Sequence, residues 1–206
     1  MALHWLSAIL CAVIFGFGGF LGARMAEEAC KSIVPFEDGP RTGKPPVGIL
    51  IGCGALLGAG LGARGVPLLG LIVLCILIWA LVACWCCDVL TGIIPDYFTL
   101  APLALILVAS AIGHQWIPPL FSAIVVFLPF AFTALISKGR GMGWGDVKLA
   151  ALGGAALGMP LSFFALAGAC MAAVAVSSIR KRTTEPMAFA PYLVGAIAIG
   201  INVPMP

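Results

Sequence analysis

The sequence predicts an all-α fold: a polytopic membrane protein with about eight transmembrane helices. Hydrophobic residues make up 62% of the chain and charged residues only 9%, whereas soluble domains carry about 25% charged residues. Several apolar runs reach the roughly 20 residues that a helix needs to cross a bilayer. The basic residues also gather on one side of the predicted membrane. We therefore expect the lipid bilayer to contact most of the surface. We expect no nucleic-acid partner.

Eight apolar runs, taken in chain order, are the predicted helices. The first has no Lys or Arg before it and no A-x-A cleavage pattern after it, so we interpret it as a retained helix and not as a signal peptide. The fourth and sixth are short and need partial burial in protein or a thin membrane. The runs cover residues 3–23, 47–63, 67–87, 98–113, 117–137, 147–160, 161–179 and 187–202. We expect them to form one membrane-embedded domain, residues 1–206, in which 24–46 is a short cytoplasmic loop.

The basic residues orient these helices. With the amino terminus outside, the cytoplasmic segments are 24–46, 88–97, 138–146 and 180–186. Of the 11 Lys and Arg residues, all except Arg64 then lie on the cytoplasmic side, including Lys148 at the start of the sixth run. Membrane proteins show this excess of Lys and Arg in their cytoplasmic loops. A seven-helix alternative that fuses 147–179 would place the basic cluster 180–182 outside, so we reject it.

Small residues recur inside the apolar runs. Glycines spaced four residues apart allow helices to approach closely, and they form the stripes Gly18–Gly22, Gly54–Gly58–Gly62 and Gly154–Gly158. The sequence also has 8 cysteines but no C-x-x-C pair, which structural zinc sites normally contain. We interpret the cysteines as packing residues. The cluster Cys84, Cys86 and Cys87 leaves metal or redox chemistry open.

Two aspartates lie at the ends of apolar runs, where ionisable groups are costly and usually functional. Asp88 ends the third run, and Asp146 opens the sixth run after a glycine-rich string that begins at Gly141. Both are expected at the cytoplasmic boundary of the membrane. Two structural alternatives stay open: Asp146 could cap its helix, and Asp88 could pair with a basic residue.

A pair of carboxylates supports peptide hydrolysis without a metal. Two carboxylates a few ångströms apart share one proton. The ionised partner takes a proton from the attacking water, and the protonated partner donates to the peptide carbonyl oxygen. Other protease signatures are missing, because the sequence has no G-x-S-x-G and no H-E-x-x-H. Gly141, Gly143 and Gly145 would let the backbone approach an extended substrate.

At these residues the chain resembles the type IV prepilin peptidases, a family of membrane aspartyl proteases with a G-x-G-D motif. Three strings carry the resemblance in the family's order: Asp88 with Pro95-Asp96, Gly143-Trp144-Gly145-Asp146-Val147-Lys148, and Phe189-Ala190-Pro191-Tyr192. Gly18-Gly19-Phe20-Leu21 in the first run is a weaker similarity. Together these strings cover most of the chain.

The resemblance implies a peptidase that removes the short basic leader of prepilins or of type II secretion pseudopilins. Cleavage falls at the cytoplasmic face of a prokaryotic inner membrane, with Asp88 and Asp146 as the catalytic pair. Supporting or substrate-binding roles are expected for Gly143, Gly145, Lys148, Pro95 and Asp96. Many members also methylate the new amino terminus and have a larger cysteine-containing insertion where this chain has 24–46. We therefore expect a short form without methyltransferase activity, metal or cofactor.

The main alternative is a proton-coupled transporter that uses Asp88 and Asp146 as a relay. Transporters place such groups near the bilayer midplane and often contain inverted repeats. Here both aspartates are expected at one face and no repeat is visible, so a protease is favoured. A membrane scaffold without activity is a third possibility, and it would keep its partner binding when Asp88 is replaced.

Overall fold

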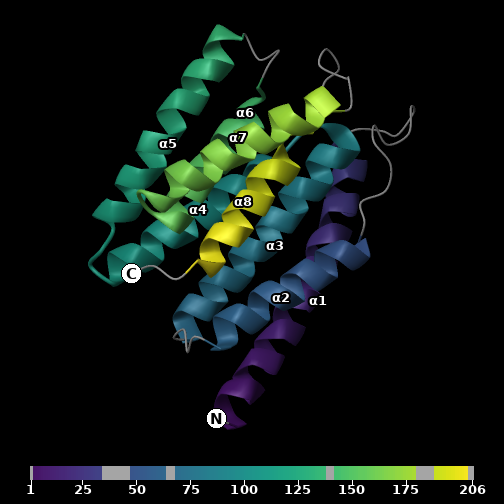
Figure 1. The fold of residues 1–206 in the computed structure, drawn as a ribbon, viewed down its shortest axis with the longest axis vertical. Helices are drawn as coiled ribbons and strands as arrows, with labels where there is room; N and C mark the ends of the chain where they lie inside the picture. The colour runs from purple at the N-terminus through teal and green to yellow at the C-terminus, as the bar shows by residue number, and fades with distance from the viewer. Residues whose placement is uncertain (1, 34–46, 64–67, 138–141, 180–187, 204–206) are drawn as a thin grey trace. The chain divides into compact units, whose positions relative to one another are not determined.

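The computed structural model describes residues 2–33, 47–63, 68–137, 142–179 and 188–203, and every regular element in these ranges is an α-helix (Figure 1). The helices are α1 (Ala2–Ile33), α2 (Val47–Ala63), α3 (Leu68–Thr91), α4 (Asp96–Ile112), α5 (Ile117–Ile136), α6 (Trp144–Leu157), α7 (Leu161–Ile179) and α8 (Ala190–Asn202). Four of them, α1, α3, α5 and α7, contain segments long and apolar enough to cross a membrane. The chain is therefore a multi-pass membrane protein.

The predicted helix boundaries hold best where turn residues delimit the apolar run. The helices α2 and α7 begin and end where the sequence predicts. The helix α1 differs, because it continues ten residues beyond its predicted end, through Ile33. Residues 24–33 are rich in helix-forming Ala, Glu, Met and Lys, and Glu27 lies 3.9 Å from Lys31 one turn later. The first part of the predicted loop 24–46 is thus helix, and its remainder lies outside the described residues.

The chain divides into two compact units, Met1–Gly92 and Ile93–Pro206. Unit 1 contains α1, α2 and α3, and unit 2 contains α4 to α8. A single membrane-embedded domain remains a prediction. Most of the basic residues that orient the helices lie outside the described residues: Arg41, Lys44, Arg64, Lys138, Arg140, Arg180, Lys181 and Arg182.

In unit 1, α1 packs against both other helices through glycines. A Cβ atom added at Gly54 of α2 would lie 2.6 Å from the carbonyl oxygen of Phe15, and one at Gly58 would overlap the carbonyl of Cys11. A Cβ at Gly22 of α1 would lie 2.7 Å from the carbonyl oxygen of Trp79 in α3. The backbones approach closely because these positions carry no side chain, which confirms the predicted packing role of Gly22, Gly54 and Gly58.

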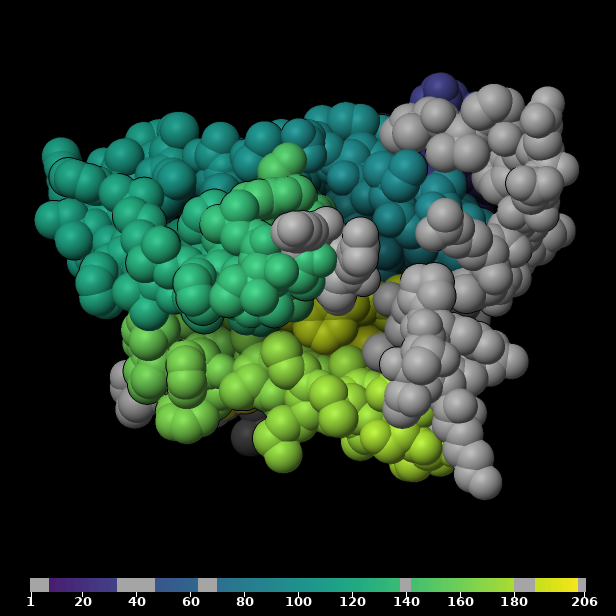
Figure 2. All heavy atoms as spheres, turned by 90° about the horizontal axis from the view of Figure 1, so that it is seen from above, coloured from purple at the N-terminus to yellow at the C-terminus, as the bar shows by residue number. Residues whose placement is uncertain are grey.

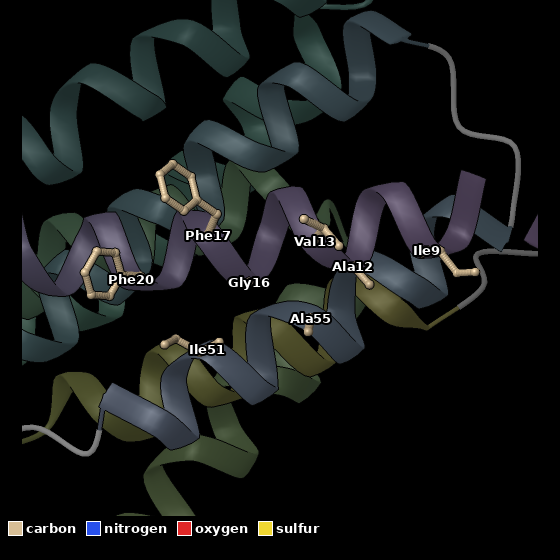
Figure 3. A pocket seen from close by; sticks show the side chains of 8 residues that line it. All are labelled: Ile9, Ala12, Val13, Gly16, Phe17, Phe20, Ile51 and Ala55. Carbon is tan, nitrogen blue, oxygen red and sulfur yellow. The ribbon is translucent and has the colours of Figure 1, made fainter. Parts of the chain in front are cut away.

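An open groove of about 520 Å³ is lined by residues of α1 and α2 (Figure 3). Gly16 forms its floor, 3.5 Å from the Cβ of Ala55 when a Cβ is added, and the aromatic rings of Phe17 and Phe20 form its rim. Every side chain in its wall is apolar. Such a surface is suited to hydrocarbon and not to water.

In unit 2, α6 is the central helix and contacts α4, α5, α7 and α8. Figure 2 shows its green spheres between the teal spheres of α4 and α5 and the yellow-green spheres of α7. Ten of its 14 residues are buried. Fourteen residues of helix span only about 21 Å, less than the hydrocarbon core of a bilayer. Burial in protein therefore accompanies the short length, as the sequence predicts for the sixth run.

Two glycines allow the neighbouring helices to reach α6. A Cβ at Gly153 would lie 2.7 Å from Cδ1 of Ile197 in α8, and one at Gly154 would lie 2.7 Å from the carbonyl oxygen of Ser122 in α5. Gly158 has a different role, because its φ of 68° ends the helix and no atom lies within 4 Å of its added Cβ. The predicted stripe Gly154–Gly158 is thus one packing glycine followed by one cap.

Candidate active site

Asp88 lies in the last turn of α3. The helix ends at Thr91, and the next residue, Gly92, has a φ of 70°, a left-handed conformation that glycine adopts without strain. The N–H of Gly92 donates to the carbonyl oxygen of Asp88 at 2.9 Å, the hydrogen bond of a left-handed helix cap. The hydroxyl of Thr91 donates to the carbonyl of Cys87 at 2.9 Å. Only 9% of Asp88 is exposed, so its carboxylate sits at a helix end that is shielded from solvent.

Asp146 lies in the first turn of α6. The N-cap residue is Gly143, with φ −77° and ψ 152°, so Asp146 is inside the helix and does not take the cap position. An added Cβ at Gly143 would lie 3.6 Å from Oδ2 of Asp146, which shows that the carboxylate extends back over the cap residue. The exposed fraction of Asp146 is again 9%. The amino-terminal end of a helix stabilises a carboxylate through the aligned peptide dipoles.

The backbone just before Asp146 is in contact with the segment that leads into α4. A Cβ at Gly145 would lie 2.9 Å from Cβ of Ile94, closer than real Cβ contacts allow. On the other side of the turn, Val147 is fully buried and packs with Ala131 and Ala134 of α5. Asp146 thus belongs to a turn that is packed on two sides.

Within unit 2, an ion pair joins the Pro95-Asp96 motif to the motif that contains Asp146 and Lys148. Nζ of Lys148 donates to Oδ1 of Asp96 at 2.6 Å. Asp96 is the first residue of α4, and Pro95, with φ −64°, is its N-cap. The hydroxyl of Thr99 donates to the carbonyl oxygen of Asp96 at 3.1 Å and stabilises the same turn. The side chain of Lys148 is 28% exposed and that of Asp96 is 61% exposed.

The structure therefore brings together most of the predicted site residues within unit 2. The start of α6 contributes Gly143, Gly145, Asp146 and Lys148, and the segment leading into α4 contributes Pro95 and Asp96. Asp88 belongs to unit 1. The pairing of the Asp88 and Asp146 carboxylates stays a prediction.

Sequence reasoning did not single out Ile94. This residue is 8% exposed and fills the space that the missing side chain of Gly145 leaves. A weak signal was present, because an apolar residue directly before a helix N-cap often packs against the first turns of that same helix. The partner across the chain, Gly145, could be found only from the fold.

The cysteine cluster lies inside unit 1. Cys84, Cys86 and Cys87 are completely buried, and Sγ of Cys87 lies 4.0 Å from the carbonyl oxygen of Ala26 in α1. Among the residues that the structure describes, no three His, Cys, Asp or Glu side chains are grouped to hold a metal ion. The cysteines act as small packing side chains where α3 meets α1.

Comparison with known families decides the identity of this arrangement. Residues 74–178, more than half of the 206-residue chain, match the type IV leader peptidase family. The chain belongs to the type IV leader peptidase family. The matched segment contains both aspartates and the motif residues of α4 and α6, so the resemblance seen in the sequence is confirmed. Neither the curated proteins nor the solved structures contain a match.

Membership in the type IV leader peptidase family implies peptidase activity on a protein substrate. The match ends before Phe189, the N-cap of α8, and the string that continues to Tyr192 forms the first turn of that helix. Pro191 lies in this first turn, where proline is readily accommodated.

Proposed function

We propose that this protein is a membrane aspartyl endopeptidase that removes the basic leader of prepilins or pseudopilins at the cytoplasmic membrane face. The observation that carries the proposal is the family match, because it spans Asp88 and Asp146 together with the motifs around them. The protein would lie in a prokaryotic inner membrane with about eight spans and the amino terminus outside. No observation supports the alternative of a proton-coupled transporter.

The two helix ends suggest different roles for the two carboxylates. Asp146 lies in the first turn of α6, where the helix dipole favours a negative charge. Asp88 lies in the last turn of α3, where the dipole disfavours one. When the pair shares one proton, we expect the proton on Asp88 and the charge on Asp146.

The reaction then follows from these charges. The Asp146 carboxylate accepts a proton from water as the water oxygen forms a bond to the peptide carbonyl carbon. The Asp88 carboxyl donates its proton to the carbonyl oxygen, which becomes a hydroxyl in the tetrahedral intermediate. Asp146 next returns its proton to the leaving amine as the C–N bond breaks, and Asp88 recovers the hydroxyl proton as the new acid forms. The pair ends in its starting state.

The test is co-expression with a prepilin, followed by gel mobility for loss of the leader. Asp88→Asn and Asp146→Asn should each abolish cleavage while the protein still accumulates in the membrane. The neutral amide can neither accept the water proton nor donate as an acid. Chelators should leave cleavage unchanged. Mass spectrometry of the product should show a new amino terminus without a methyl group.

Two results would contradict the proposal. Cleavage that persists in Asp88→Asn but is lost in Asp96→Asn would place the catalytic carboxylate on α4. Cleavage that persists in Asp146→Asn would remove the aspartyl mechanism altogether. A methylated product would overturn the short-form interpretation alone.

A further inference from the structure

The ion pair between Asp96 and Lys148 connects residues 52 positions apart in the chain. Lys148 follows Asp146 by two residues, and side chains at i and i+2 of a helix point to different faces. The ammonium nitrogen of Lys148 lies 2.6 Å from Oδ1 of Asp96. The ion-pair partner of Lys148 thus lies on α4.

Within the described residues of unit 2, the turn that carries Asp146 is attached at several points. Ile94 packs against the backbone of Gly145, and Val147 packs with Ala131 and Ala134 of α5. The third attachment is the ion pair to Asp96. Among these three, the ion pair can be removed by isosteric substitutions that leave the apolar packing intact.

Resting on the proposed role of Asp146 as the charged carboxylate, we propose that Asp96 and Lys148 are positioning residues. Their ion pair docks the first turn of α4 on α6 and holds the Asp146 turn in its reactive place. The pair also balances the charge of Lys148, so that the local field at Asp146 comes mainly from the helix end.

Few other charges compete with this pair. The helices that pack against α6 are α4, α5, α7 and α8. Within their described residues the titratable side chains are Asp96 and Tyr97 on α4, Cys170 on α7 and Tyr192 on α8, and α5 has none. On α6 itself Asp146 and Lys148 are the charged residues. Within the described residues of unit 2, Asp96 and Lys148 are therefore the charged side chains on α6 and its neighbouring helices, apart from Asp146 itself.

The experiment compares the full-length enzyme with Asp96→Asn, Lys148→Met and the double variant, using a prepilin peptide as substrate. Each single variant should lower kcat about three- to tenfold with KM unchanged, since a small displacement of a reacting group is costly. The double variant should be no worse than the poorer single variant, because both substitutions remove the same interaction.

The pH dependence of kcat separates positioning from a loss of folded enzyme. A smaller folded fraction lowers kcat by the same factor at every pH. Lys148→Met leaves the negative charge of Asp96 unbalanced, and this charge opposes ionisation of Asp146. The acid limb of the pH profile of kcat should therefore move to higher pH, by roughly half a unit. Asp96→Asn leaves the Lys148 charge unbalanced and should move the limb to lower pH. The double variant should return the limb toward that of the wild type.

The matched control is Glu27→Gln, which removes an exposed ion pair of the same chemistry on α1 and should leave kcat and the acid limb unchanged. Multiplying effects in the double variant, or acid limbs that do not move in either single variant, overturn the positioning role. If a neutral variant does not fold, the exchanged pair Asp96→Lys with Lys148→Asp should recover about a third of the wild-type kcat. An exchanged variant that folds but is inactive also overturns the positioning role. Full activity in Asp146→Asn refutes the proposed function instead.

Discussion

Gly145 shows how closely the site depends on a single missing side chain. Ile94 occupies the space where a Cβ would lie, and that atom would be 2.9 Å from Cβ of Ile94. The contact involves the branch point of a buried side chain, so it cannot be relieved by turning a flexible end. The G-x-G-D motif therefore has a structural requirement at its second glycine that is separate from the chemistry of the aspartate.

Gly145→Ala should lower cleavage because Ile94 and the start of α4 must move away from the Asp146 turn, at a cost of about 1–3 kcal/mol in stability. Gly168→Ala in α7 is the matched control, since no atom lies within 4 Å of its added Cβ and alanine favours helix. Prepilin cleavage and unfolding midpoints in an SDS titration would be measured for both. Equal midpoints and equal cleavage in the two variants would show that the Ile94 contact is unimportant.

Part of this site is visible in the sequence and part is not. Asp146 at a helix start and Asp88 at a helix end follow from where the apolar runs begin and end. The partner of Lys148 does not, because Asp96 is 52 residues away and its position depends on α4 docking against α6. The same is true of Ile94 and Gly145.

At the scale of helices, the hydrophobic runs predict which segments form helices better than they predict the residues at which those helices end. The apolar run predicts that the first helix ends at residue 23, because charged residues begin at Arg24, yet charge is compatible with helix once the chain leaves the bilayer. Helix-forming residues and the Glu27–Lys31 pair carry α1 on to Ile33. The composition of the segment contained this information, and the apolar count did not.

The packing of α1 and α2 can be tested with two glycines on one helix. Gly54→Ala places a methyl group 2.6 Å from the carbonyl oxygen of Phe15, whereas Gly52→Ala meets nothing within 4 Å. We expect Gly54→Ala to lower the unfolding midpoint, at a cost of about 1–3 kcal/mol, and Gly52→Ala to leave it unchanged or raised. A lower midpoint in Gly52→Ala, with Gly54→Ala unaffected, would contradict the packing described for unit 1.

At the scale of the whole molecule, the orientation in the membrane is the main prediction. Reporter fusions at Asp38, Gly139 and Lys181 should all report a cytoplasmic location, because ten of the 11 basic residues lie in or beside those segments. A fusion at Gln115, in the turn between α4 and α5, is the control for the opposite side. A periplasmic signal at any of the first three positions would refute the eight-helix topology.

The burial of α6 has a consequence for how the protein is made. A helix of 14 residues that contains Asp146 and Lys148 in its first two turns is a poor candidate for insertion alone, since charged residues oppose partitioning into the bilayer. During synthesis α4 and α5 emerge before it, and α7 and α8 after it. Biogenesis should therefore proceed through an intermediate in which α6 is held against α5, through Gly154 and Ser122, until the last two helices arrive and enclose it.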